Sequence, residues 1–238
     1  MPAFVNMAAI GSVRSASDGL GPLDSVAHPL QPGAYRGETW LGDVRLGTFA
    51  LEVADQGDGE QIEVDLCSVS EREAAAAAFR SGPVQGTPVY AVFHCDHGNT
   101  GLYVIVRDKS GRGVVFDSRK LQPGDYYIVT PVRPGVWTLA TNKKAAGELE
   151  VQPPTPAKAP RASAAGAMIK VDDKAFSPPR AQIVAGDGIA FEVGGKDLAI
   201  RLDLKQRAGA FAKGRRRVGI RYPGRSTFDD KPPPKAAA

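Results

Sequence analysis

The sequence predicts an all-β protein with one short helix. Glycine and proline are abundant, with 27 and 19 copies in 238 residues, and together they exceed the usual share of about 12%. Between these turn-forming residues lie short runs that alternate apolar and polar side chains, as half-buried strands require. The chain is 42% hydrophobic, which is sufficient for a packed core. No apolar run approaches the roughly 18 residues of a membrane-spanning helix, so we expect no membrane span.

Composition divides the chain into five segments. Residues 1–30 have weak periodicity and predict an irregular N-terminal arm. Residues 31–152 predict a β-sandwich domain. Residues 153–166 hold four prolines and many alanines without a large apolar side chain, and therefore predict an extended linker. Residues 167–230 predict a smaller β module, and residues 231–238 an extended tail.

The larger domain carries strand patterns at short intervals. Residues 35–53 predict a hairpin around the turn at Leu41-Gly42-Asp43. Further strands are predicted at 61–66, 88–94, 101–107, 113–116, 125–130, 136–141 and 148–151. This spacing is typical of antiparallel sheets that pack as a sandwich.

One helix is expected near residues 70–80. Ser70-Glu71-Arg72-Glu73 matches the capping box, and five alanines and Phe79 follow it. Acidic side chains at a helix start interact favourably with the helix dipole. We therefore interpret Glu71 and Glu73 as capping residues rather than as acid–base groups.

Two stretches resemble cupredoxins, the small copper-binding β-sandwiches. The family carries a stretch with the spacing Pro-Gly-x-Tyr-x-Phe-x-Cys-x-x-His. Residues 123–133 have the same spacing, in the sequence Pro123-Gly124-Asp125-Tyr126-Tyr127-Ile128-Val129-Thr130-Pro131-Val132-Arg133. Residues 147–151 match the closing strand of the family. Residues 168–191 resemble its opening strands. The resemblance implies two cupredoxin- or immunoglobulin-like sandwich modules. Thr130 stands where the copper thiolate would be and Arg133 where the imidazole would be, so we expect no blue copper centre and no cofactor.

Metal-capable side chains cluster at His94-Cys95-Asp96-His97. On a strand, Cys95 and His97 would point to one face and His94 and Asp96 to the other. Each face would supply two ligands, fewer than the four that zinc normally takes. We interpret Cys95 as a core residue and expect no catalytic residue. The alternatives are a zinc or copper site at Cys95, His97 and His94, and a Cys–His nucleophile.

Other enzyme classes and secretion have no support in the sequence. It has no phosphate-binding glycine loop followed by lysine and no Gly-x-Ser-x-Gly motif. Cys67 and Cys95 are too few for a disulfide framework, and the N-terminus lacks the basic and apolar regions of a secretory signal. We expect a cytoplasmic protein with reduced thiols.

Positive charge is concentrated at the C-terminal end. Residues 196–238 hold 12 Lys/Arg against 4 Asp/Glu, whereas the rest of the chain is net acidic. Such asymmetry favours an acidic protein surface or nucleic acid as a partner. The predicted partner-binding residues are Arg215, Arg216, Arg217, Arg221 and Arg225.

Taken together, these features predict a non-catalytic structural or accessory subunit. It would make protein–protein contacts in a larger assembly or with copies of itself, and the module at 167–230 would attach it. On this view, removal of residues 167–238 would leave the larger domain folded. The alternatives are a nucleic-acid-binding protein that uses the basic C-terminal strand, and a zinc- or copper-binding protein.

Overall fold

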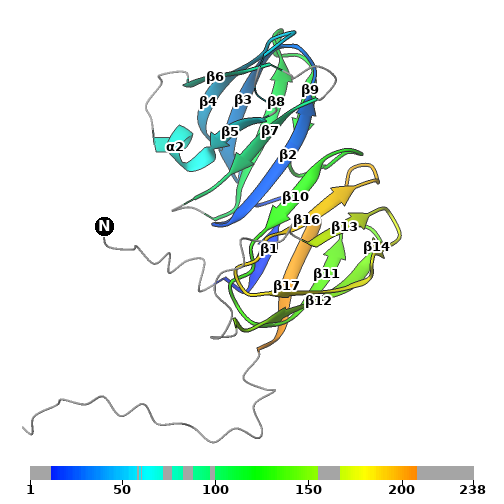
Figure 1. The fold of residues 1–238 in the computed structure, drawn as a ribbon. Coiled ribbons are helices and arrows are strands. Elements are labelled where there is room, and N and C mark those ends of the chain that lie inside the picture. The colour runs from blue at the N-terminus through cyan, green and yellow to red at the C-terminus, as the bar shows by residue number, and fades with distance from the viewer. Residues whose placement is uncertain are drawn as a thin grey trace, which may run out of the picture.

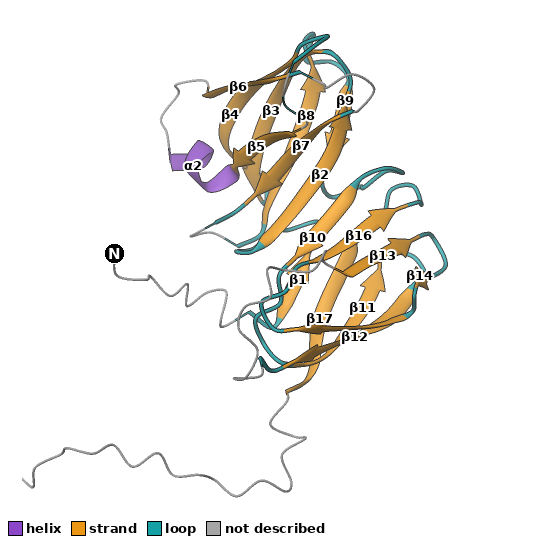
Figure 2. Ribbon diagram, in the orientation of Figure 1, coloured by secondary structure: helices purple, strands orange, loops and turns teal. Residues whose placement is uncertain are grey.

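The computed structural model describes residues 12–57, 59, 61–71, 77–82, 88–96, 100–154 and 167–207. Most of these residues are in strands, and the helix among them, α2 (Leu66–Glu71), is short. The all-β prediction is therefore confirmed. The strands form three sheets, which Figures 1 and 2 show as two stacked groups. Within the described part of the chain, no helix is long and apolar enough to cross a membrane.

The largest sheet has seven strands in the order β14-β13-β16-β10-β2-β7-β5. At its centre, β2 and β10 pair antiparallel, with Asp24 opposite Val129 and Ala27 opposite Tyr126. This pairing joins the two halves of the sheet. Its strands are β2 (Asp24–Leu30), β5 (Gln61–Asp65), β7 (Val89–His94), β10 (Tyr126–Val129), β13 (Ala167–Val171), β14 (Phe176–Ser177) and β16 (Ile189–Val193).

Two five-stranded sheets cover the two halves of this central sheet (Figure 1). The first, which we call the upper sheet, has the order β6-β4-β3-β8-β9, and the second, the lower sheet, has the order β1-β17-β11-β12-β15. The upper strands are β3 (Gly33–Leu41), β4 (Val44–Val53), β6 (Ala77–Ser81), β8 (Leu102–Asp108) and β9 (Val114–Asp117). The lower strands are β1 (Arg14–Ala16), β11 (Gly135–Thr141), β12 (Ala146–Gln152), β15 (Arg180–Val184) and β17 (Ile200–Arg207).

Aromatic side chains pack against one another in the core of both halves. In the upper half, the ring of Phe93 on β7 lies 6.0 Å from that of Phe49 on β4 and 5.6 Å from that of Phe116 on β9. In the lower half, Tyr127 on β10 stacks on Phe191 on β16, with 5.9 Å between ring centroids. Each fully buried ring contributes roughly 1.5–3 kcal/mol. The buried apolar residues of both halves form one connected core.

The predicted hairpin and most predicted strands are confirmed. Gly42 has a φ of 56°, and its two-residue turn with Asp43 joins β3 to β4. A positive φ is what such a tight hairpin turn demands. The strands predicted from 61–66 to 148–151 correspond to β5 and β7–β12, with ends shifted by a few residues.

The predicted position of the helix is wrong. α2 ends where the capping box begins, and its cap is Asp65, whose carboxylate accepts a hydrogen bond from the Cys67 N–H at 3.0 Å. Residues 77–80, the end of the predicted helix, instead belong to β6 (Ala77–Ser81), which pairs in parallel with β4. There Phe79 packs edge-on against Phe49. This tertiary pairing overrides the helix propensity of the alanines.

The prediction of an irregular arm is wrong for the part of residues 1–30 that the structure describes. That part contains β1 and the central strand β2. The polar His28 and the following Pro29 obscured the strand pattern of β2. Proline lacks an N–H group; the pairing of β2 with β10 ends before it, at Ala27, whereas Pro29 still lies opposite Tyr90 of β7. Residues 1–11 lie outside the described residues.

The division into two sandwich modules is also wrong. Strands that follow residue 166 are hydrogen-bonded to strands that precede residue 153: β16 pairs with β10, β17 with β11, and β15 with β12. A change in composition at 153–166 suggested a domain boundary, yet a connection of any composition can join two strands of one structure. Residues 167–207 therefore complete the same sheets and the same core.

Candidate interaction surface

The sequence-predicted site residues fall in different places. Arg215, Arg216, Arg217, Arg221, Arg225 and His97 lie outside the described residues. Cys95 is buried just after β7. The Nδ1 atom of His94 lies 2.8 Å from the Oδ1 atom of Asp96 at the surface, so these two side chains share a side of the chain. In the described ranges, no three His, Cys, Asp or Glu side chains gather as a metal site would require.

A second histidine lies beside a buried carboxylate. His28 Nδ1 is 2.6 Å from Asp125 Oδ1, and the His28 ring stacks on Phe116. The other Asp125 oxygen accepts the Gln122 N–H at 2.7 Å. Asp125 thus holds together β2 and the turn before β10, and we assign this pair to the architecture.

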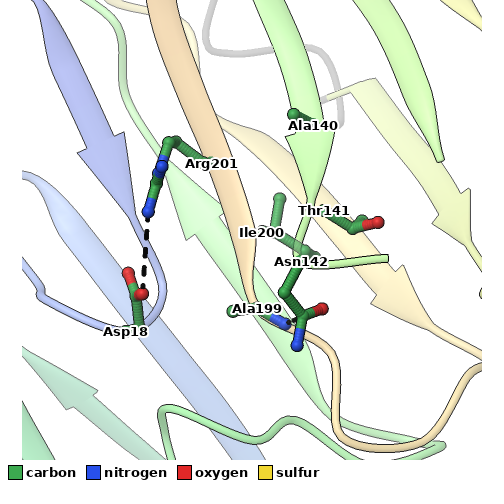
Figure 3. A pocket seen from close by; sticks show the side chains of 7 residues that line it. All are labelled: Asp18, Ala140, Thr141, Asn142, Ala199, Ile200 and Arg201. Atoms are coloured by element: carbon green, nitrogen blue, oxygen red, sulfur yellow. Dashed lines mark hydrogen bonds and ion pairs between the residues drawn. The ribbon is translucent and has the colours of Figure 1, made fainter. Parts of the chain in front are cut away.

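Two neighbouring hollows share Asp18 and Arg201. In the smaller one, of about 90 Å³, Arg201 on β17 lies 3.9 Å from Asp18 (Figure 3). Asn142 in its wall accepts the Ala199 N–H at 3.1 Å and donates to the Asp197 carbonyl at 2.9 Å. The amide of Asn142 therefore joins the end of β11 to the start of β17.

A buried acid lies at the junction between β2 and β10. Asp24 Oδ2 accepts the Gly21 N–H at 2.9 Å, whereas Asp24 Oδ1 and the Tyr127 hydroxyl are buried without a hydrogen-bond partner. Burial raises the pKa of Asp24 from 3.8 to about 7, although the hydrogen bond from the Gly21 N–H opposes this rise. Burial is also the main reason why the pKa of Tyr127 is raised, and the negative charges of Asp24 and Asp18 raise it further.

The outer face of the upper sheet gathers a different set of side chains. Along β3, Thr39 is buried on the inner face, and a Cβ atom on Gly37 would collide with the ring of Phe49. Glu38 and Trp40 therefore point outward, because successive strand residues alternate. Their neighbours complete what we call the arginine–aromatic face: Arg36, Glu38, Trp40, Arg45, Tyr103, Arg107 and Arg119.

Three arginines of this face surround one buried carboxylate. Arg36 Nε and Arg45 Nη1 lie 4.0 and 3.6 Å from Glu38 Oε1, and Arg107 Nε lies 3.6 Å from Glu38 Oε2. Cross-strand register explains the convergence, since Arg36 is directly opposite Arg107 and a bulge at Thr39/Trp40 shifts Arg45. Three positive charges thus meet one negative charge.

Aromatic side chains continue the face beside these charges. The rings of Trp40 and Tyr103 stack with centroids 6.2 Å apart, and the Arg119 guanidinium lies 4.2 Å over the Tyr103 ring. The Tyr103 hydroxyl donates to the Gly42 carbonyl at 2.7 Å, which fixes the ring. The Trp40 Nε1 atom is buried and has no hydrogen-bond partner.

Sequence reasoning missed this face. The signal was the set of alternate residues Arg36, Glu38 and Trp40 in the predicted hairpin, where an outward strand face would ordinarily carry small polar groups. The convergence on Glu38 depends on register across three strands, and a single strand does not reveal it.

Glu38→Gln is expected to lower the free energy of unfolding by about 1 kcal/mol, because three partly exposed arginines lose their shared counter-charge. Urea unfolding at low and high salt measures this, and the loss should shrink as salt screens the arginines. Glu52→Gln is the matched control, since the Glu52–Arg80 pair on the same sheet is well exposed. A change at Glu38 no larger than that at Glu52 would contradict the expectation.

Comparison with known proteins gave no match to a family model, to a curated protein or to a solved structure.

Proposed function

We propose that the protein is a non-catalytic structural or accessory subunit that binds an acidic protein partner through the arginine–aromatic face. The observation that carries this proposal is the combination of Arg36, Arg45 and Arg107 with Trp40 and Tyr103 on one sheet face. Arginine, tryptophan and tyrosine are enriched at protein interfaces and supply most of their binding energy. The excess of arginine over Glu38 selects for an acidic surface.

The alternative of nucleic acid receives less support from this face. A single-stranded nucleic acid stacks its bases on open aromatic rings and runs along a row of positive charges. The Tyr103 residue is only 8% exposed, and Trp40 and Arg119 flank its ring. The arginines converge on one point instead of following a groove. A protein partner fits this arrangement better.

The basic C-terminal residues extend the same proposal. Arg215, Arg216, Arg217, Arg221 and Arg225 lie outside the described residues, but their charge suits the acidic partner that the face requires. The resemblance to cupredoxins argues against electron transfer, because Thr130 and Arg133 stand where two copper ligands would be.

The proposal is tested by measuring the size of the native complex for the wild-type protein and for charge-reversed variants. The protein isolated from its source at its natural abundance should sediment as part of a complex larger than one chain. Arg36→Glu with Arg107→Glu should release it, because reversed charges repel an acidic surface. Arg180→Glu, at an exposed position on β15 of the lower sheet, should leave the complex intact. Thermal unfolding verifies that each variant is folded. A wild-type protein that is a single chain in its source, or a complex indifferent to the paired change, would refute the proposal.

A further inference from the structure

The guanidinium groups around Glu38 retain their hydrogen-bond donors. Their 3.6–4.0 Å distances from the carboxylate exceed the 2.7–3.2 Å of a hydrogen bond. In the described part of the chain, no hydrogen bond engages the guanidinium group of Arg36, Arg45 or Arg107. Each guanidinium carries five N–H donors, so a bound anion would meet several unused donors at one point.

Solvent can reach these donors. The side chains of Arg36, Arg45 and Arg107 are 55%, 49% and 28% exposed, whereas that of Glu38 beneath them is 9% exposed. An incoming anion would therefore sit above the arginines, with Glu38 below. The arginines would lie between two negative groups.

The charge count favours a doubly charged ligand. Three guanidiniums and one carboxylate leave two positive charges at this point. A partner's Asp or Glu would neutralise one of them. A phosphorylated serine or threonine carries about −1.5 to −2 at pH 7 and three acceptor oxygens, so it would neutralise nearly all of the excess. Arginine pairs with phosphate by two parallel hydrogen bonds, a geometry that lysine cannot supply.

We propose that the three arginines around Glu38 bind a phosphorylated serine or threonine side chain of the partner. This inference rests on the proposed function and adds the chemistry of the ligand. The neighbouring Trp40, which is partly exposed, then contacts residues beside the phosphorylated one. Phosphorylation of the partner thereby controls attachment of this subunit.

Fluorescence anisotropy with labelled peptide pools tests this inference on the full-length protein. Each pool holds one fixed central residue, either phosphoserine, glutamate or serine, with the flanking positions randomised. The phosphoserine pool is expected to bind roughly tenfold more tightly than the glutamate pool, because the second charge adds charge-assisted hydrogen bonds. The serine pool is expected not to bind measurably.

A pH series and matched variants complete the test. Since the second pKa of a phosphate is about 6, binding of the phosphoserine pool should weaken several-fold between pH 7.5 and 5.5, while the glutamate pool changes little. Arg107→Gln should reduce phosphoserine binding by about tenfold, and Arg180→Gln should leave it unchanged. Circular dichroism confirms folding.

The outcomes separate this inference from the proposed function. Equal binding of the phosphoserine and glutamate pools, or no binding of the phosphoserine pool, overturns the phosphate inference. If the native complex still depends on Arg36 and Arg107 in that case, the proposed function stands. Phosphoserine binding that is indifferent to Arg107 also overturns the inference, because the phosphate would then lie elsewhere.

Discussion

Asp24→Asn is expected to stabilise the protein above pH 7 by about 4 kcal/mol, since each pKa unit corresponds to 1.36 kcal/mol. The pKa of Asp24 is about 7 in the folded protein against 3.8 for an exposed carboxyl, with burial as the main cause. Asparagine keeps the oxygen that accepts the Gly21 N–H but carries no charge to bury. The substitution therefore removes an electrostatic cost and keeps the hydrogen bond.

The pH dependence has a definite sign. Because the folded pKa is raised, the stability contribution of Asp24 is fully present below pH 4, declines as the pH rises towards 7, and is lost above that value. Urea unfolding should therefore show that the free energy of unfolding of the wild-type protein is lower at pH 8 than at pH 5. The Asp24→Asn variant should lack this part of the pH dependence. Asp55→Asn, at an exposed position, is the control. Parallel pH profiles for wild type and Asp24→Asn would contradict the expectation.

Truncation after Gln152 is expected to abolish folding. It removes β13–β17, and with them the direct neighbours of β10 and β11. The buried residues of those strands, including Phe191 and Leu202, leave with them. The loss of several such side chains, each worth roughly 1.5–3 kcal/mol, exceeds the 5–15 kcal/mol by which a typical domain is stable.

Near-ultraviolet circular dichroism and amide dispersion in NMR spectra measure this loss. A chain that ends after Arg207 is the control and should keep a native spectrum, because the described sheets are then complete. A folded chain that ends at Gln152 would restore the two-module interpretation of the sequence.

The sequence was sufficient for elements with local determinants. The β3–β4 hairpin depends on Gly42, whose neighbours alternate, and its prediction was correct. α2 and β6 were misassigned because alanine favours helices, whereas the decisive interaction, Phe79 on Phe49, is between residues far apart in the chain. The sequence did not predict the arginine–aromatic face for a similar reason. Glu38 and its arginines belong to three strands, and only the register between those strands brings them together.

The pairing of β1 with β17 also has a kinetic consequence. Arg14 lies opposite Asp203, and the Ser17 hydroxyl accepts the Ile200 N–H across 183 residues of sequence. Contacts between such distant residues close very large loops, which slows folding. During synthesis the ribosome must release β17 before the lower sheet can be completed. Until then the nascent chain exposes the unpaired edge of β11, so we expect this protein to depend on chaperones while it is made.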